Sequence, residues 1–383
     1  AAPCNIALMR QAQSVKRGVK DADGTPREFC TITVTDGIAM GHQGMKSSLV
    51  SREVIADSTE LTVRGHSYDA LVGLAGCDKS LPGLMMAMCR LNVPSVFMYG
   101  GSILPGRYKG NDVTVVDVFE AVGKYAAGAS EKDLEDLEKV ACPSAGACGG
   151  QFTANTMACV SEVMGLALPY SSGAPAPYED RDKYAYESGK QIMNLIEKNI
   201  RPRDIVTRKS LENAATIVAA TGGSTNAGLH LPAIANECGI EFNLDDVVEI
   251  FKRTPYIADL KPGGQYVAKD VYEAGGVPII IKTLFEGGYI HGDCLTVTGK
   301  TLEENLDYVE FNYDQKVIRP YNNPLSPTGG VVGLKGNLAP DGAIVKVAGM
   351  ENTFFEGVAR CFDCEEDAFK CVSEKGYSEG DVI

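Results

Sequence analysis

The hydrophobic pattern of residues 70–99 constrains the fold more than any other feature of the sequence. A buried-strand run at 70–75 (ALVGLA) precedes a helical run at 81–91 (LPGLMMAMCRL), and a second buried strand follows at 94–99 (PSVFMY). Pro82 is compatible with the helix, because the first helical turn does not need that N–H group. The strand–helix–strand order predicts two neighbouring parallel strands covered by the connecting helix.

The flanking segments extend this pattern. A β-branched run at 29–35 (FCTITVT) predicts another strand, which ends at Asp36. Residues 51–63 have helical spacing, and the middle of the chain adds apolar helical runs at 154–168, 211–220 and 244–251. We therefore predict an α/β fold made of parallel sheet(s) with flanking helices.

The composition and the hydrophobic pattern of the sequence change near residue 325. From Gly329 the chain is glycine-rich and holds short β-like pieces (VVGL, AIVKVAG, VARCF). We expect a large N-terminal domain over 1–325 and the start of a smaller, β-barrel-like domain over 326–383. Typical domain sizes predict that this second domain is truncated at Ile383. The opening Ala1, in place of Met, predicts that the natural N-terminus is missing too.

The composition narrows the possible partners. The net charge of −14 argues against nucleic acid or an anionic membrane, since both attract a surplus of Lys and Arg. No apolar run approaches the roughly 20 residues of a membrane helix. We therefore expect neither nucleic acid nor a membrane as partner.

Twelve cysteines are a high count for 383 residues. A disulfide framework is disfavoured, because disulfide-dense domains are usually small. Buried packing thiols are the favoured reading for one group of them, namely Cys30, Cys89, Cys142, Cys159, Cys238, Cys294 and Cys371. Cys361 and Cys364 have the spacing of a metal site, but no second pair of ligands lies near them in the sequence, so zinc binding is disfavoured.

Reactive side chains follow two of the predicted strands. Asp36 follows the first, and Cys77, Asp78 and Lys79 follow the second. Ligands of open α/β sheets bind at the carboxyl ends of strands, so these residues are candidates for one site. A capping aspartate beside a buried cysteine explains the second group equally well. His42 follows the Asp36 turn and is the best histidine candidate for the pocket.

Two further thiols precede predicted helices. Cys148 lies in a glycine-rich loop before a helix that starts near Thr153, and Cys4 precedes a helical run. A helix N-terminus favours a thiolate, which is the form that binds iron or zinc. The segment 222–226 (GGSTN) breaks two helices and could also bind an anion.

Several long strings resemble dihydroxy-acid dehydratases of the IlvD/Edd family, and together they span the chain. These strings are PCN at 3–5, GHQGMKSSLVSREVIADS at 41–58, CDKSLPG at 77–83, GGSILPGRYKG at 100–110, CPSAGACGGQFTANTM at 142–157, GGSTNAGLHL at 222–231, HGDCLTVTGKTLEENL at 291–306 and PTGGVVGLKGNLAPDGAIVKVAG at 327–349.

The resemblance implies two metal groups. An iron–sulfur cluster would be held by Cys4, Cys77 and Cys148; 2Fe–2S is favoured and 4Fe–4S is the alternative. Mg²⁺ would be held by Asp36, Asp78 and a carbamylated Lys79. The carbamate is chemically reasonable, because a free ammonium repels a cation whereas a carbamate presents oxygens.

Some family elements have no counterpart in this chain. The glutamate that completes the magnesium site and the serine that acts as the base would both lie beyond Ile383. The usual histidine after the PCN motif is replaced by the run Ile6-Ala7-Leu8.

The implied activity is that of a hydro-lyase of valine and isoleucine biosynthesis. It would convert 2,3-dihydroxyisovalerate and 2,3-dihydroxy-3-methylvalerate to 2-keto acids. A sugar-acid (aldonate or phosphogluconate) dehydratase of the same superfamily is one alternative, and a non-catalytic iron–sulfur or zinc protein is another. The resemblance also implies a homodimer, cytoplasmic in a bacterium and mitochondrial or plastid in a eukaryote.

Overall fold

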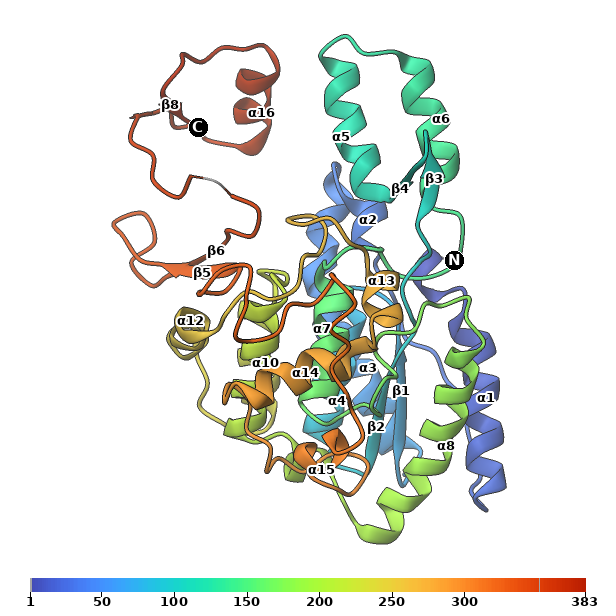
Figure 1. Cartoon of the computed structure of the whole chain (residues 1–383). Helices are drawn as coiled ribbons and strands as arrows, with labels where there is room; N and C mark the ends of the chain where they lie inside the picture. The colour runs from blue at the N-terminus through green and yellow to red at the C-terminus, as the bar shows by residue number, and fades with distance from the viewer. Residues whose placement is uncertain (1, 351) are drawn as a thin grey trace. The chain divides into compact units, whose positions relative to one another are not determined.

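The computed structural model describes residues 2–350 and 352–383. The chain forms two compact units, residues 1–348 and 349–383. The first unit has a mixed α/β architecture in which helices greatly outnumber strands, and Figure 1 shows helices to either side of its pair of parallel strands. The second unit is small, and its described residues form one helix and two very short strands.

The predicted strand–helix–strand unit is confirmed. Strand β1 (Leu71–Ala75) pairs in parallel with β2 (Ser95–Tyr99), and helix α4 (Ser80–Leu91) connects them. Every residue of β2 is buried, and α4 is buried over almost its whole length, so apolar packing covers this unit on several sides. The carboxyl end of β1 is therefore held in a fixed position inside the core.

The parallel sheet is smaller than the sequence suggested, because the strand predicted at 29–35 does not form. The segment runs outside any strand, and its hydroxyl groups bind neighbouring elements instead. Thr31 Oγ1 lies 2.6 Å from Ser58 Oγ, and Asn5 Nδ2 donates to Thr33 Oγ1 at 3.0 Å. These contacts attach the segment to helix α3 (Ser48–Gly65) and to the N-terminal residues rather than to β1.

Helices make up most of the first unit. The helices that the sequence predicts at 51–63, 154–168, 211–220 and 244–251 correspond to α3, α7 (Thr153–Val163), α10 (Arg208–Ala220) and α12 (Leu244–Arg253). The other elements before residue 310 are the 3-10 helices η1 (Pro3–Asn5) and η2 (Gln43–Ser47), with α1 (Leu8–Asp21), α2 (Asp36–Ala39), β3 (Gly106–Tyr108), β4 (Asn111–Val113), α5 (Val115–Ala126), α6 (Glu131–Ala141), α8 (Asp180–Lys198), α9 (Pro202–Ile205), α11 (Ala227–Glu237), α13 (Ala268–Glu273), α14 (Gly276–Glu286) and α15 (Leu302–Leu306). Among the described residues, no helix combines the length and the apolarity that crossing a membrane requires.

The β-like pieces after residue 329 do form strands. Strand β5 (Val331–Leu334) pairs antiparallel with β6 (Ala343–Lys346), and this hairpin belongs to the first unit. The second unit holds β7 (Val358–Ala359), α16 (Glu365–Ser373) and β8 (Asp381–Val382). The compact units thus divide at 348/349, because the hairpin packs on α12. The domain boundary at 325/326 stays a prediction.

Helices α1 and α8 lie side by side in the first unit (Figure 1) and approach closely through two glycines. A Cβ atom on Gly18 would lie 2.0 Å from Tyr186 O, and one on Gly189 would lie 2.2 Å from Val15 O. Neither carbonyl can yield without moving its helix. This close crossing holds α1, and with it the N-terminal segment that carries Cys4.

We expect the Gly18→Ala variant to be destabilised by about 1–3 kcal/mol, the usual cost of overpacking. The measurement is the free energy of unfolding from denaturant titration. Gly123→Ala in α5 is the matched control, because a Cβ there meets nothing within 4 Å. The control should be neutral or up to about 1 kcal/mol more stable, since alanine favours helix. Equal behaviour of the two variants would refute the close crossing.

Candidate functional site

Cys4 and Cys77 meet at the carboxyl end of β1. Both side chains are buried, and Cys4 Sγ lies 3.8 Å from Thr35 Oγ1. The approach depends on Gly76, where a Cβ would lie 1.9 Å from the carbonyl oxygen of Cys4. The Cys4 thiol donates to the sulfur of Cys77, which raises the pKa of Cys4 and lowers that of Cys77. Two of the three predicted cluster ligands are therefore in contact.

Cys148 reaches the same region from the loop before α7. Its carbonyl oxygen accepts a hydrogen bond from Asn155 Nδ2 at 2.5 Å, which ties the loop to the helix. Burial, followed by the charges of Asp78 and Cys77, raises the pKa of Cys148 to about 12. The sequence predicted a thiolate favoured by the helix start, but burial and like charges outweigh the helix dipole here. The coupling with Cys77 shows that the three thiols share one neighbourhood.

Asp36 and Lys79 form a buried ion pair beside these thiols. Lys79 Nζ lies 2.5 Å from Asp36 Oδ2, and both side chains are less than a tenth exposed. Ser48 Oγ donates to the other carboxylate oxygen of Asp36 at 2.7 Å. Asp36 begins the short helix α2, so it is presented by a helical turn and not by the strand end that the sequence predicted.

Asp78 lies at the N-terminus of α7. The hydroxyl group of Thr153 and the backbone N–H of Ala154 both donate to its carboxylate. Burial, followed by the negative charge of Asp36, nevertheless raises the pKa of Asp78 to about 6. The two predicted magnesium carboxylates therefore repel each other across a shared, poorly hydrated space. A cation placed between them would remove that repulsion.

These side chains have the chemistry that the two groups require. Two buried thiols and the half-buried thiol of Cys148 share one neighbourhood, which suits an iron–sulfur cluster that keeps one iron free of protein ligands. Among the described residues, no three His, Cys, Asp or Glu side chains form a ready-made site for a single ion. A carbamate on Lys79 would supply the oxygens that Asp36 and Asp78 alone do not. The assignment of these six residues stays a prediction.

The glycine-rich segment 222–226 supports the site in a way that the sequence did not reveal. It is the predicted break between α10 and α11, and its side chains bind the start of α7. Ser224 Oγ lies 2.8 Å from Thr153 Oγ1, and Asn226 Nδ2 donates to the same oxygen at 2.8 Å. The segment therefore orients the hydroxyl group that binds Asp78.

The histidines divide into one exposed and one buried candidate. His42 is exposed and bonds locally to Ile38 O and to Gly44 N, so it acts as a turn residue. His230 is buried, and burial, then Arg52 and Lys79, lower its pKa to about 3. A neutral, buried imidazole near Lys79 was not recognised in the sequence, where only its place in the GGSTNAGLHL string singled it out.

The remaining cysteines follow the packing prediction in part. Cys89, Cys159 and Cys294 are buried, while Cys238 and Cys371 are half-buried. Cys30 and Cys142 are exposed, so the prediction that they pack in the interior is wrong. Both lie in extended or loop segments that run over the surface, where no second layer covers them. Cys361 and Cys364 are also exposed.

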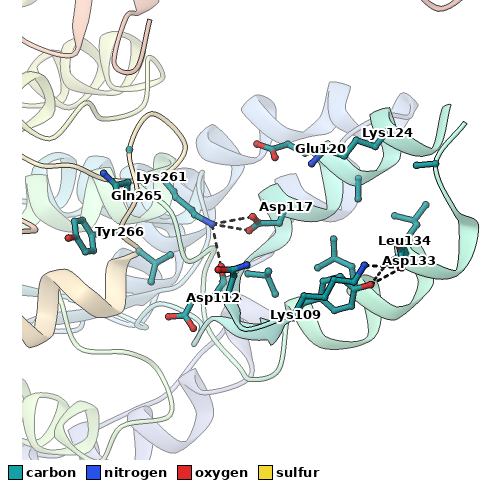
Figure 2. A pocket seen from close by; sticks show the side chains of 18 of the residues that line it. Lys109, Asp112, Asp117, Glu120, Lys124, Asp133, Leu134, Lys261, Gln265 and Tyr266 are labelled. Atoms are coloured by element: carbon teal, nitrogen blue, oxygen red, sulfur yellow. Dashed lines mark hydrogen bonds and ion pairs between the residues drawn. The ribbon is translucent and has the colours of Figure 1, made fainter. Parts of the chain in front are cut away.

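One cavity of the first unit lies away from these residues. It has a volume of about 880 Å³ and lies between the α5–α6 hairpin and the segment 261–270 (Figure 2). Two lysines that line this cavity are paired with aspartates. Lys261 Nζ lies 3.2 Å from Asp117, and Lys109 Nζ lies 3.1 Å from Asp133. None of the six predicted ligands lines it, so we do not assign it to the site.

The chain matches two sequence models of one family. The model described as dihydroxy-acid/6-phosphogluconate dehydratase N-terminal matches residues 1–305, and its C-terminal counterpart matches residues 316–383. The chain therefore belongs to this dehydratase family, as its motifs predicted.

Curated relatives agree with the family models. The chain is 78% identical over 384 residues to the dihydroxy-acid dehydratase of Pelagibacter ubique, and 75% identical over 386 residues to that of Parvibaculum lavamentivorans. It is 51% identical over 386 residues to that of Sulfurisphaera tokodaii. Each alignment covers 100% of this chain and 67%, 67% and 69% of the respective relative. The chain thus spans about two thirds of the length of these proteins.

Proposed function

We propose that this protein is a hydro-lyase that dehydrates 2,3-dihydroxy carboxylates to 2-keto acids. Its substrates would be 2,3-dihydroxyisovalerate and 2,3-dihydroxy-3-methylvalerate, the precursors of the valine and isoleucine skeletons. The high identity to dihydroxy-acid dehydratases along the whole chain supports this activity. The observation that carries it is the proximity of two buried pairs, Cys4–Cys77 and Asp36–Lys79. Cys4 Sγ lies 3.8 Å from the hydroxyl of Thr35, the residue before Asp36, and Lys79 follows Cys77 by two residues.

The proposed cofactors are an iron–sulfur cluster on Cys4, Cys77 and Cys148 and Mg²⁺ on Asp36, Asp78 and carbamylated Lys79. We favour a 2Fe–2S cluster over 4Fe–4S. When bound, the two groups would supply Lewis-acid chemistry that polarises the substrate hydroxyls and carboxylate, rather than electron transfer.

The protein's own residues prepare this site. Ser48 and Thr153 donate hydrogen bonds to Asp36 and Asp78 respectively, and so fix the orientation of both carboxylates. The raised pKa values of Cys4 and Cys148 keep these thiols protonated at neutral pH without a cluster. Cluster loading must therefore release protons from the buried thiols.

The reaction removes the proton at C2 and the hydroxyl at C3 as water, and the resulting enol becomes the 2-keto acid. The burial of the Asp36–Lys79 pair suits this chemistry, because electrostatic interactions between charged groups are stronger in a site that contains little water. The base at C2 is expected to be the serine that the family resemblance places beyond Ile383, and we assign no base among the described residues.

The test is a substrate comparison with the protein in its full natural length. After oxygen-free reconstitution of the cluster, 2,3-dihydroxyisovalerate should be converted to its 2-keto acid, and omission of Mg²⁺ should abolish turnover. Gluconate and 6-phosphogluconate test the second candidate, a sugar-acid dehydratase, because the description of the family model names 6-phosphogluconate dehydratase beside dihydroxy-acid dehydratase. Faster turnover of a sugar acid would support that candidate. Cluster binding without turnover of either would support a non-catalytic iron–sulfur protein.

We propose a homodimer in the cytoplasm as the working form. The organisms of the relatives favour the cytoplasmic alternative over an organelle. Light scattering after size-exclusion chromatography tests the dimer, which should have twice the mass of the chain.

A further inference from the structure

The backbone directly after strand β6 is fixed by two hydrogen bonds to one carbonyl oxygen and by close packing. The N–H groups of Val347 and Ala348 both donate to Gly330 O, at 2.9 and 3.0 Å. The Ala348 side chain sits among three glycines, where added Cβ atoms on Gly222, Gly263 and Gly330 would lie 3.1, 2.8 and 3.0 Å from its Cβ. Lys346 immediately precedes Val347 and Ala348, so the backbone that carries its side chain is held rigidly.

The Lys346 ammonium is partly buried, and it has no acidic partner among the described residues. Nζ is 3.5 Å from the carbonyl oxygen of Gln151, which is a weak contact for a charged donor. In the part of the chain that the structure describes, no carboxylate lies within 4.0 Å of it. Burial alone lowers the pKa of Lys346 to about 8. A half-buried cation without an anion is costly, which points to a negatively charged ligand.

The position of Gln151 connects this ammonium to the candidate site. Gln151 belongs to the loop that runs from Cys148 to Thr153, whose hydroxyl group binds Asp78. The loop is rigid at this point, since Gln151 N donates to Lys261 O at 2.7 Å and its side chain donates to Thr221 Oγ1 at 3.0 Å. Lys346 thus contacts the same loop that presents a predicted cluster ligand.

We propose that Lys346 binds the carboxylate of the dihydroxy-acid substrate, an inference that rests on the proposed function. Among the six predicted ligands, Lys79 is the one cation, and it is paired with Asp36 or loses its charge on carbamylation, so Mg²⁺ would be the sole positive charge that they offer an anionic substrate. Lys346 supplies the opposing charge from β6. An ammonium–carboxylate hydrogen bond would satisfy both groups and would give the substrate one orientation in the site.

The test compares two inhibitors that differ only in the charge that Lys346 would contact. 2-Hydroxyisovalerate carries the carboxylate, and 2-hydroxyisovaleramide replaces it with a neutral amide. Calorimetry on the cluster-loaded wild-type protein should give tighter binding of the acid. In the Lys346→Met variant this preference should shrink roughly 10- to 100-fold, because a hydrogen bond between charged groups is lost. Lys346→Arg should restore most of it, and KM should change more than kcat.

Lys335→Met is the matched control from the same hairpin. Lys335 is exposed and already paired with Asp245 at 2.6 Å, so its replacement should leave the acid preference unchanged. Visible absorbance checks that each variant carries its cluster. If Lys346→Met fails to load, Lys346→Gln takes its place, since it keeps hydrogen-bond donors without the charge.

An acid preference that survives the loss of the Lys346 charge would overturn this assignment, and so would an equal loss in the Lys335 control. A wild-type protein that converts no dihydroxy acid would refute the proposed function as well. Wild-type turnover together with an unchanged preference in the variant would refute the role of Lys346 alone.

Discussion

The Cys77→Ser variant should lose both its visible cluster absorbance and its dehydratase activity. Cys77 is the central thiol of the three, since it hydrogen-bonds to Cys4 and is electrostatically coupled to Cys148. A serine hydroxyl is a hard donor that stays protonated, and so replaces a soft thiolate poorly. The loss of activity should exceed the roughly 10- to 100-fold effect of removing a residue that only supports a metal ligand.

Cys89→Ser is the control for this experiment. Cys89 is as buried as Cys77 and lies in α4, but it is not among the thiols coupled to Cys4 or Cys148. This variant should keep its absorbance and most of its activity. Full absorbance and turnover in Cys77→Ser would contradict the cluster assignment, whatever the control does.

The Asp78→Asn variant should keep the cluster absorbance and lose turnover. An amide oxygen carries no charge, so the affinity for Mg²⁺ falls while the three thiols stay in place. We expect a loss of about 100-fold or more in kcat/KM, which exceeds the usual contribution of a supporting group. The measurement pairs the visible spectrum with an assay of 2,3-dihydroxyisovalerate over a range of Mg²⁺ concentrations.

Asp69→Asn provides the matched control, because Asp69 is exposed and lies just before β1, on the other side of the strand from Asp78. It should behave as the wild-type protein does at every Mg²⁺ concentration. If Asp78→Asn stayed fully active, the magnesium assignment would be wrong. If it lost the absorbance as well, Asp78 would instead be needed to form the cluster site.

The candidate site was partly accessible from the sequence. Asp78 and Lys79 directly follow Cys77, so three reactive groups lie at one strand end simply because they are adjacent in the sequence. The contact of Cys4 with Cys77 could not be derived in this way. It requires η1 to pack against Gly76. The sequence does not show why residue 76 must be glycine, whereas the structure shows that a Cβ there would collide with the carbonyl oxygen of Cys4.

The same distinction explains the expectations that were wrong. The run at 29–35 has strand composition, but its hydroxyl groups bind α3 and the N-terminal segment, so β propensity was overridden by tertiary contacts. Cys30 and Cys142 were expected inside because cysteine is usually buried, whereas their segments run over the surface.

The sequence by itself determined the β1–α4–β2 unit, the main helices and the family, because these depend on local periodicity and on long contiguous motifs. Only the tertiary structure decided which of the twelve thiols meet, that Asp36 pairs with Lys79, and that Lys346 reaches a loop 195 residues away in the sequence. Such contacts follow from close packing between distant segments, which no local pattern encodes.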